Sequence, residues 1–397
     1  MLTDQDILRF RLDTPGTQQV IHFNNAGSSL PPEVVRQAVN DYNNEEMTLG
    51  GYETNQKYLP ELEATYDSIA TLLKANREEI ALVENATVAW NAAFQAIDWK
   101  DGDVIIATRA DYASNYLAYL HLKRKYDLEI KVMPTLPTGD PDLNAFDHMI
   151  DSKVKLVSVT HMPTNGGLTV DAEAIGAITK KHGVLYLLDA CQSAGQYPLD
   201  VQKIGCDMLS ATGRKYLRAP RGTGFLYVRK SVLPKLAPYW VDLHSAEWTG
   251  ADSYQIRTDA RKFESWEGSR ANTMGLKAAI DYALAIGIEN IWPRVQHLAN
   301  KLRHEMEKLP HVLVHDIGDL KSGLVSFTVK GKSAQEVKTF LHQHAINVSW
   351  NGVSNTYLDM TSRDLKEVVR ASVHYYNTEE EIYRFIEVLG KIMDVKP

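Results

Sequence analysis

Asp189 and Lys215 are residue types that can do covalent chemistry together, and each follows an apolar stretch typical of a β-strand. Asp189 ends the run Val184–Leu188, and Lys215 follows Thr212 and Arg214. A lysine that can lose its proton forms a Schiff base with a carbonyl group, and the neighbouring arginine lowers the pKa of that lysine. Taken alone, Asp189 is equally well explained as a helix N-cap, and the lysine segment as a solvated turn.

A third segment suits an anionic group. Asn85, Ala86 and Thr87 precede a helical stretch, Val88–Ile97. Small residues at a helix start expose backbone N–H groups, and the threonine hydroxyl adds a donor, although an ordinary helix cap has the same pattern. Pyridoxal phosphate (PLP) needs a lysine for its Schiff base, a carboxylate that keeps its ring nitrogen protonated, and donors for its phosphate. The three segments together therefore predict a PLP site.

The elements that position these residues are short apolar strands that alternate with amphipathic helices. Strands are predicted at Asp103–Thr108, Glu129–Met133, Lys155–Thr160, Val184–Leu188, Met208–Ser210 and Gly224–Val228, and helices at Ser114–Tyr126 and Asp171–His182. Continuous apolar runs between helices indicate an α/β fold with a mostly parallel sheet buried on both faces, the last strand being antiparallel. Ligands bind at the carboxyl ends of such strands, where Asp189 and Lys215 fall.

The last third of the chain has a different pattern. A long helix is predicted at Ile288–Leu309, then strands at Val312–His315, Leu324–Val329, Asn347–Trp350 and Val368–Val373, with helices at Ala334–His344 and Glu379–Ile392. This pattern is typical of a small α+β domain. We predict a large PLP-binding domain of residues 20–285 and a small C-terminal domain of residues 286–397, with residues 1–19 packing on either.

Composition narrows the function classes. The 397 residues carry a net charge of −7, which gives no basic footprint for nucleic acid. No run of about 18 apolar residues could span a bilayer, and the polar start Met1–Asp6 is unlike a signal peptide. The two cysteines, Cys191 and Cys206, lack the spacing of a zinc site, and their scarcity fits a reducing compartment. These features predict a cytoplasmic protein with no nucleic-acid or membrane partner and no metal, and the predicted PLP site adds a small-molecule amino-acid substrate.

Three motifs together resemble the class V aminotransferase superfamily: Leu187–Ser193, Ser210–Lys215 and Gly222–Tyr227. The resemblance extends from about Phe23 to the end of the chain. This group includes cysteine desulfurases, selenocysteine lyases, isopenicillin N epimerase-like proteins and the C–S lyases of ergothioneine biosynthesis. The resemblance implies a fold-type I PLP-dependent transferase that forms a homodimer with its active site at the subunit boundary.

The resemblance also implies roles for individual residues. Lys215 would carry the cofactor and Asp189 would pair with its ring nitrogen. Gln192 would bond the phenolic oxygen, near which Thr164 takes the place of an asparagine, with Asn165 as the alternative. Tyr112 would stack on the ring, unless it is an ordinary half-buried tyrosine. The phosphate would be held by Ala86, Thr87, Thr212 and Arg214, and Ser269 or Trp266 would reach the phosphate in the partner subunit unless they belong to an ordinary surface loop.

The substrate end is implied by two further segments. Val369–Thr378 resembles the family's "R-x-S…YNT" segment, in which Arg370 would clamp the substrate α-carboxylate with two parallel hydrogen bonds. The alternative is a salt-bridged strand arginine. Asn24–Ser29 resembles a loop at the substrate mouth, where Ala26 and Gly27 would offer backbone donors to the carboxylate; the alternative is a simple turn.

The sequence departs from the family's pattern at one position that distinguishes cysteine desulfurases from the other activities of the family. Cysteine desulfurases place a catalytic cysteine in a loop of the small domain, and the matching stretch Asn347–Asn355 has none. Gly50–Glu53, Glu84–Trp90 and Ala211–Arg218 are similar to segments of hercynylcysteine sulfoxide lyase-like proteins. We therefore expect a PLP-dependent lyase that cleaves the Cβ–S bond of a cysteine S-conjugate or sulfoxide to pyruvate and ammonia, with ergothioneine biosynthesis as the candidate pathway. The alternatives are an epimerase, an aminotransferase or a desulfurase-like enzyme. A non-catalytic PLP-binding protein is disfavoured, because the expected lysine and arginine are both present.

Overall fold

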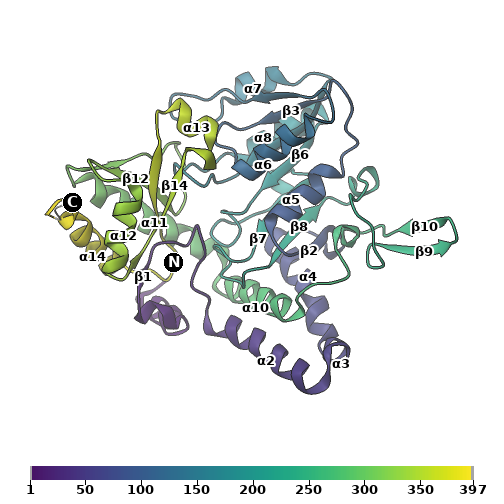
Figure 1. Cartoon of the computed structure of the whole chain (residues 1–397), viewed down its shortest axis with the longest axis horizontal. Coiled ribbons are helices and arrows are strands. Elements are labelled where there is room, and N and C mark those ends of the chain that lie inside the picture. The colour runs from purple at the N-terminus through teal and green to yellow at the C-terminus, as the bar shows by residue number, and fades with distance from the viewer. Residues whose placement is uncertain (1, 395–397) are drawn as a thin grey trace.

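A seven-stranded sheet lies at the centre of the computed structural model, which describes residues 2–394 (Figure 1). The strand order is β2-β8-β7-β6-β5-β3-β4. The strands are β2 (Ile80–Val83), β3 (Val104–Ala107), β4 (Glu129–Val132), β5 (Val154–Thr160), β6 (Leu185–Asp189), β7 (Met208–Thr212) and β8 (Gly224–Val228). Strand β8 pairs antiparallel with both β7 and β2, and the other pairs are parallel. The predicted mostly parallel sheet is confirmed, including its antiparallel late strand, whereas β2 is an additional strand.

Helices cover both faces of this sheet, which is why its strands are apolar throughout. Neighbouring residues of β6, Leu187 and Leu188, are fully buried in two different core clusters. The cluster with Leu187 includes residues of α5 (Ala86–Gln95) and α6 (Ala113–Leu122). The cluster with Leu188 includes residues of α4 (Leu59–Leu73), α8 (Ala172–His182) and α10 (Arg270–Ile286). The loops at the strand ends are thereby held between two packed layers.

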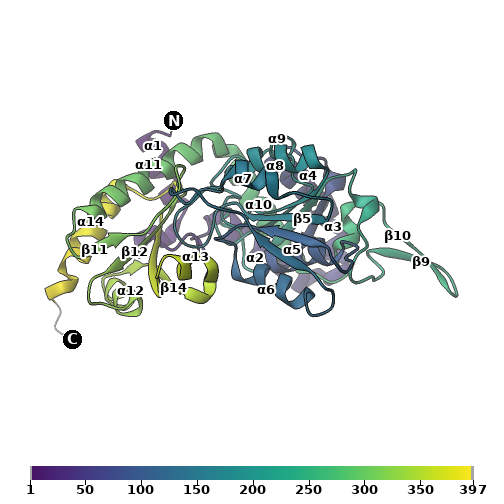
Figure 2. The same cartoon turned by 90° about the horizontal axis from the view of Figure 1, so that it is seen from above.

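A four-stranded antiparallel sheet of order β11-β12-β15-β14 forms the C-terminal unit (Figure 2). Its strands are β11 (Val312–Val314), β12 (Leu324–Val329), β14 (Ser349–Gly352) and β15 (Glu367–Ser372). The helices of this part are α11 (Ile288–Glu307), α12 (Ala334–Gln343), α13 (Tyr357–Ser362) and α14 (Glu379–Gly390). Gly287, with a φ of 85°, separates α10 from α11 at the predicted domain boundary. The exact domain limits stay a prediction.

The N-terminal segment contacts both units. It contains α1 (Asp4–Leu12) and β1 (Ile21–His22), which pairs in parallel with β13 (Ile346–Asn347). Phe10 packs edge-on against Tyr375 of the C-terminal segment and against Tyr282 of α10. The following helices, α2 (Glu33–Leu49) and α3 (Gly51–Lys57), lead into α4, and α2 packs against α10.

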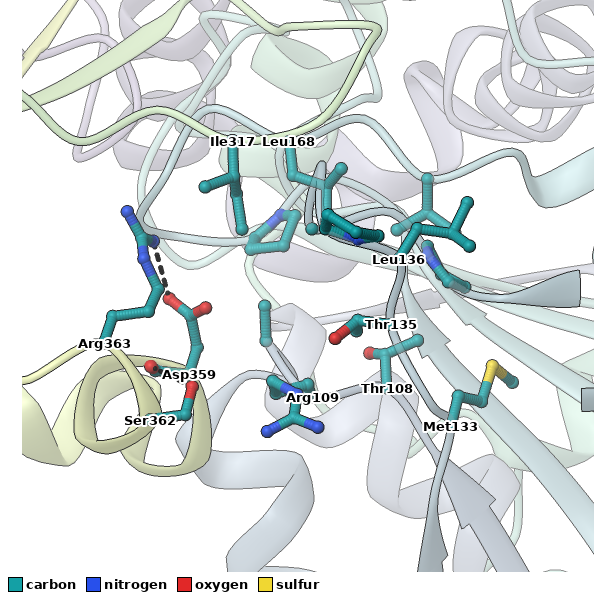
Figure 3. A pocket seen from close by; sticks show the side chains of 16 residues that line it. Thr108, Arg109, Met133, Thr135, Leu136, Leu168, Ile317, Asp359, Ser362 and Arg363 are labelled. Carbon is teal, nitrogen blue, oxygen red and sulfur yellow. Dashed lines mark hydrogen bonds and ion pairs between the residues drawn. The ribbon is translucent and has the colours of Figure 1, made fainter. Parts of the chain in front are cut away.

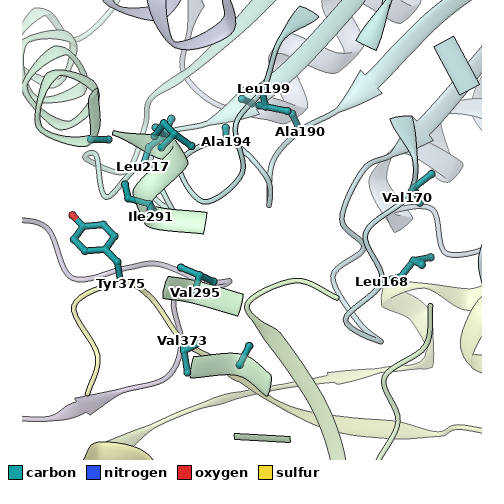
Figure 4. Packing of buried hydrophobic residues seen from close by; sticks show 14 of the residues in the cluster. Leu168, Val170, Ala190, Ala194, Leu199, Leu217, Ile291, Val295, Val373 and Tyr375 are labelled. Atoms are coloured by element: carbon teal, nitrogen blue, oxygen red, sulfur yellow. The ribbon is translucent and has the colours of Figure 1, made fainter. Parts of the chain in front are cut away.

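The main apolar core continues from the turn after β6 into the C-terminal unit (Figure 4). Ala190 and Ala194 of that turn share the cluster with Ile291 and Val295 of α11 and with Val373. The segment that follows Asp189 is therefore fixed by packing rather than left as a free loop.

A hairpin of β9 (Ala246–Gly250) and β10 (Ser253–Ile256) projects from the body of the molecule (Figure 1). Its Trp248 and Tyr254 are exposed. Within residues 2–394, no helix is long and apolar enough to cross a membrane.

Candidate active site

A cavity of about 520 Å³ opens at the carboxyl ends of β5, β6 and β7. It brings together residues from five separate segments of the chain. Its lining includes Ala86, Thr87, Tyr112, Thr164, Asp189, Gln192, Thr212, Arg214 and Lys215, all of which are predicted cofactor contacts. The volume suits a small-molecule cofactor with its substrate.

Asp189 ends β6 and is held in one orientation by two hydrogen bonds. Its Oδ1 accepts from the backbone N–H of Cys191 and its Oδ2 accepts from Nδ2 of Asn115, both at 2.9 Å. The segment after Asp189 is a turn, so the aspartate caps that turn and is not the N-cap of a helix. These two bonds fix the orientation of a carboxylate that can pair with a protonated ring nitrogen. Asn115 is a functional residue that the sequence did not single out, and its only signal is its position on the first turn of α6, three residues after Tyr112.

Lys215 follows β7, and within the part of the chain that the structure describes its side-chain amine makes no hydrogen bond. Burial lowers the pKa of its amine; the nearby Cys191 and Asp189 oppose this effect, and the guanidinium groups of Arg214 and Arg370 add to it. A lowered pKa increases the fraction of neutral amine, which is the form that attacks a carbonyl group or accepts a proton. The geometry thus gives Lys215 the properties of a reactive lysine.

A further group of residues lining the cavity is suited to hold an anion. Asn85 caps α5 by accepting the backbone N–H of Val88 at 3.0 Å, and Ala86 and Thr87 form the first helical positions. The first N–H groups of a helix have no intrahelical partner and attract anions. Nη1 of Arg214 is buried and has no hydrogen-bond partner among the described residues. Such an unpaired buried donor fits the phosphate of PLP.

Two predicted contacts at this cavity already bond within the protein. The hydroxyl of Thr212 donates to the carbonyl of Thr223 at 3.3 Å, and Nε2 of Gln192 donates to the carbonyl of Ala26 at 3.2 Å. The Gln192 Oε1 is buried without a partner in the described residues. Tyr112 is the residue that precedes α6, and its N–H donates to Thr160 and Asp111 while its side chain lines the cavity. The contacts of these residues with a cofactor stay predictions.

Arg370 on β15 is a buried cation with no carboxylate partner among the ion pairs of residues 2–394. Its Nη1 donates to the backbone carbonyl of Thr164 at 2.8 Å and to the Thr164 hydroxyl, and its Nη2 donates to Ser349 at 2.9 Å. The salt-bridge alternative is therefore not supported. Burial lowers the pKa of Arg370 to about 10, so the group stays charged at neutral pH and suits an anionic ligand.

Thr164 connects Arg370 to the cavity, whereas Asn165 turns away from it. Asn165 donates to Thr356 at 3.0 Å and accepts from Asn351 at 2.9 Å, on the side of the C-terminal unit. The alternative in which Asn165 fills the asparagine position near the phenolic oxygen is therefore not supported.

A sequence model described as Aminotransferase class-V matches residues 20–385, which is most of the chain. This chain belongs to the class-V aminotransferase family. It is accordingly a PLP-dependent enzyme, and the predicted cofactor is confirmed together with the family, the fold class and the enzyme class.

Relatives of this class-V aminotransferase carry names from sulfur metabolism. A probable cysteine desulfurase of Xylella fastidiosa is 29% identical over 404 residues, covering 98% of this chain and 96% of that protein. A probable cysteine desulfurase of Synechocystis is 30% identical, covering 93% of this chain and 90% of that protein. The apo structure of cysteine desulfurase from Thermococcus onnurineus NA1 superposes with a TM-score of 0.92 at 28% identity, covering 99% of both chains. The cystine C–S lyase C-DES in complex with cysteine persulfide shares the fold, with a TM-score of 0.86 at 22% identity over 97% of this chain and 100% of that chain.

The predicted backbone donors at Ala26 and Gly27 are not free. The N–H of Ala26 donates to Oγ of Ser372 at 2.9 Å, and that of Gly27 donates to the carbonyl of Asn24 at 3.0 Å. The Gly27 bond closes a turn, in agreement with the alternative that the sequence left open, and the Ala26 bond ties this turn to the end of β15. The loop instead contributes a hydrogen-bond acceptor to the site. The backbone carbonyl of Ala26 accepts from the side-chain amide of Gln192.

Ser269 does not line the cofactor cavity of this chain. It is the N-cap of α10, accepts from the N–H of Asn272 at 3.2 Å, and lines a neighbouring cavity with Gly222 and Ser265. Trp266 is exposed. Contact of either residue with the phosphate in a partner subunit stays a prediction.

A separate cavity of about 370 Å³ lies between the end of β3 and the C-terminal unit (Figure 3). Arg109 and Asp359 line it, and Arg363 donates to the Asp359 carboxylate at 3.2 Å and to the carbonyl of His315. None of the predicted site residues lines this cavity. The 370 Å³ cavity and the cofactor cavity are adjacent. Ala110 and Pro163 line the 370 Å³ cavity, and Tyr112 and Thr164, one or two residues further along the chain, line the cofactor cavity.

Replacing Arg370 with alanine is expected to raise KM by about ten- to a hundredfold while kcat changes much less. The reason is that the substrate carboxylate loses hydrogen bonds to a charged donor, which contribute roughly 1.5–3 kcal/mol. Steady-state kinetics with the best substrate measures both constants. The KM of Arg370→Lys should lie between those of the wild type and Arg370→Ala. Arg384→Ala, on the exposed face of α14, is the matched control. An unchanged KM in Arg370→Ala would assign this arginine to structure alone.

Replacing Asp111 with asparagine is expected to change how stability depends on pH. Burial raises the pKa of Asp111 to about 7, against hydrogen bonds from Thr160 and Tyr119. Between pH 5 and about 7 the unfolded chain has lost this proton while the native protein still holds it, so wild-type stability falls as pH rises through this range and levels off above it. Relative to the variant, the wild type should lose roughly 1–3 kcal/mol of unfolding free energy over this range. Denaturant unfolding at pH 5 and 8 measures this difference, and identical pH profiles would contradict the raised pKa.

Proposed function

We propose that this member of the class-V aminotransferase family is a lyase, which breaks the Cβ–S bond of a cysteine S-conjugate or a cysteine sulfoxide. With a thioether conjugate and water, the products are a thiol, pyruvate and ammonia. Carbon–sulfur chemistry on an amino acid is supported by the cysteine desulfurases among the relatives and by the fold shared with a cystine C–S lyase. The narrower prediction of a hercynylcysteine sulfoxide substrate in ergothioneine biosynthesis stays a prediction that the same assay tests.

The positions of the two cysteines and the raised pKa values of their thiols favour elimination over desulfuration. The stretch Asn347–Asn355, where desulfurases place their nucleophile, forms β13, β14 and a short 3₁₀ turn without a cysteine. Cys191 lines the cavity, but burial raises the pKa of its thiol well above the ordinary value, and the Asp189 charge adds to this effect. Cys206 is buried outside the cavity, and burial raises its pKa to about 12. A thiol that stays protonated is a poor nucleophile toward sulfur.

Each residue of the site has a separate role in the proposed elimination. Bound PLP supplies a sink for the electron pair that is left at the substrate Cα. Asp189, oriented by Asn115 and by the Cys191 N–H, holds the positive charge of the ring nitrogen. Arg370 holds the substrate carboxylate, and the neutral amine of Lys215 accepts the Cα proton. Loss of that proton and of the Cβ sulfur substituent, followed by hydrolysis, gives pyruvate and ammonia.

A panel of cysteine S-conjugates and their sulfoxides, scored for pyruvate, tests the proposal. We expect pyruvate and ammonia in equal amounts from at least one member. Alanine from L-cysteine would instead indicate a desulfurase. A keto acid formed together with a stably aminated cofactor would indicate an aminotransferase, and exchange of the Cα hydrogen without pyruvate would indicate an epimerase.

Replacing both cysteines with serine is expected to leave lyase turnover within about twofold of wild type, because neither thiol is assigned a step. Pyruvate formation by the double variant measures this. Thermal unfolding of the same protein separates a folding defect from a chemical one, since both side chains are buried or partly buried. Loss of turnover in a folded double variant would support persulfide chemistry instead.

A homodimer with its active site at the subunit boundary is part of the same proposal. The exposed hairpin β9–β10 and the loop with Trp266 and Ser269 offer surfaces for a second copy. Sedimentation of the purified enzyme tests the dimer. The cytoplasmic location stays a prediction.

A further inference from the structure

Another large cavity, distinct from those above, lies on the other side of the strand end that lines the cofactor cavity. Thr160 and Met162 line the cofactor cavity, and the intervening His161 lines a separate cavity of about 880 Å³. This cavity is bounded by residues 140–144, 169–173 and 319–320 and by Tyr197. None of the predicted cofactor or substrate residues is among its lining. Its volume falls within the range of sites for small organic molecules.

Two buried side chains in this cavity have unused hydrogen-bonding groups. His161 is 2% exposed and Thr169 is 3% exposed. The His161 Nδ1 and the Thr169 Oγ1 are buried without a hydrogen-bond partner among the described residues. Buried polar atoms are nearly always satisfied, so this pair indicates a ligand or an ordered water that bonds to them. Burial lowers the pKa of His161 to about 4, so its imidazole is neutral at pH 7 and can accept as well as donate.

The rim of the cavity is acidic and lacks cations. The lining includes Asp140, Asp142, Asp171, Glu173 and Asp319 but no lysine or arginine. Asp142 and Asp171 cap helices, and Asp140 accepts from the N–H of Asp319, so these three are engaged. Glu173 and Asp319 are exposed, and within residues 2–394 their carboxylates have neither a hydrogen bond nor an ion pair. The uncompensated charge at the mouth attracts a cation.

Tyr197 adds an aromatic ring to the lining of this cavity. Its ring makes edge contacts with His161 at 5.0 Å and with Trp292 at 5.1 Å between ring centroids, which hold it in place. Tyrosine rings bind apolar groups and organic cations. In the described part of the chain, no group of histidine, cysteine or acidic side chains is arranged to hold a metal ion, so the acidic rim does not form a metal site.

We propose that this cavity binds a small organic ammonium ligand that carries a hydroxyl or similar polar group at its far end. The ammonium group lies at the rim with Glu173 and Asp319. The body packs against Tyr197, and the polar end bonds to Thr169 and His161. The site is independent of the cofactor cavity and does not depend on the reaction that takes place there.

The probe is N,N-dimethyltyramine, which has a cationic tertiary amine, an aromatic body and a distal hydroxyl. A tertiary amine cannot form a Schiff base, so the probe does not react with the cofactor. Two comparators each lack one feature: 4-ethylphenol has no charge, and N,N-dimethylphenethylamine has no hydroxyl. Titration calorimetry on the holoenzyme at low salt should show saturable binding of the probe, and binding of 4-ethylphenol should be at least about fivefold weaker.

Substitutions at the two ends of the cavity locate the site. Glu173→Gln combined with Asp319→Asn should weaken probe binding by about three- to tenfold without affecting 4-ethylphenol. Thr169→Val, which nearly preserves shape, should weaken the probe by about two- to tenfold but not N,N-dimethylphenethylamine. Glu247→Gln combined with Asp252→Asn on the exposed hairpin is the matched control for the loss of two charges. Ring chemical shifts of His161 should move on titration.

The proposal is overturned if the probe does not bind at millimolar concentration. It is also overturned if the probe and 4-ethylphenol bind equally, or if the rim double variant binds the probe as the wild type does. Because no residue of the cofactor cavity is altered, thermal unfolding and the absorbance of bound cofactor serve as the measures that each variant remains folded.

Discussion

Lys215→Ala is expected to lower kcat by at least about a thousandfold. The amine has two roles at this position, attachment of the cofactor and transfer of the Cα proton, and a positioned general base alone contributes roughly 10²–10⁴ in rate. The burial that lowers the pKa of Lys215 cannot be reproduced by a lysine at the surface. Pyruvate release under substrate saturation measures the loss.

The attachment is checked separately from the rate. After borohydride reduction, mass spectrometry should find the cofactor on the peptide that contains Lys215 in the wild type and no such adduct in the variant. Lys230→Ala, at an exposed lysine 15 positions later, should behave as wild type in both assays. An adduct on another lysine, or full turnover in Lys215→Ala, would remove the foundation of the proposed chemistry.

Asp189→Ala is expected to lower kcat by at least about a hundredfold while the protein keeps part of its cofactor. The carboxylate stabilises positive charge on the ring nitrogen, and one preorganised electrostatic partner of this kind is worth roughly 10²–10³ in rate. The cofactor retains its other contacts at Lys215 and at the phosphate end of the cavity. Cofactor content by absorbance, together with turnover per bound cofactor, separates the two effects.

Asp189→Asn refines this test. An amide keeps nearly the same shape but cannot carry the negative charge, so its turnover per bound cofactor should resemble that of Asp189→Ala. Asp252→Asn, in the exposed turn of the β9–β10 hairpin, is the control for loss of one charge. Wild-type turnover in Asp189→Asn would show that shape rather than charge matters at this position.

Strands with strong local patterns were predictable, and elements that depend on distant partners were not. The run Val184–Leu188 predicts a strand that is buried on both faces, because five apolar residues in succession leave no polar face. β2 is short, and it becomes part of the sheet only through its pairing with β8, more than 140 residues later. The hairpin β9–β10 is largely exposed, so it has no apolar alternation that a sequence pattern could indicate.

The same distinction applies to the site. Asn115 holds Asp189 from 74 positions earlier in the chain, and nothing in its local sequence indicates that bond. Ala26 was expected to present its N–H to the substrate, but Ser372, 346 positions later, takes that N–H. A backbone donor can be assigned to a ligand only when every competing acceptor is known, and the competing acceptor here lies almost at the other end of the chain.

The sequence by itself determined the chemical identity of this protein: a lysine and an aspartate at the ends of buried strands, a helix start suited to phosphate, and an arginine in the last third. These features are local, because apolar runs and helix caps are set by neighbouring residues. The tertiary structure alone decided which groups meet. Arg370 bonds to Thr164, 206 positions away, rather than to a carboxylate. His161 lines the 880 Å³ cavity, while its neighbours Thr160 and Met162 line the cofactor cavity. Partners and burial depend on the packing of distant segments, and burial in turn sets the pKa values on which the reactivity depends.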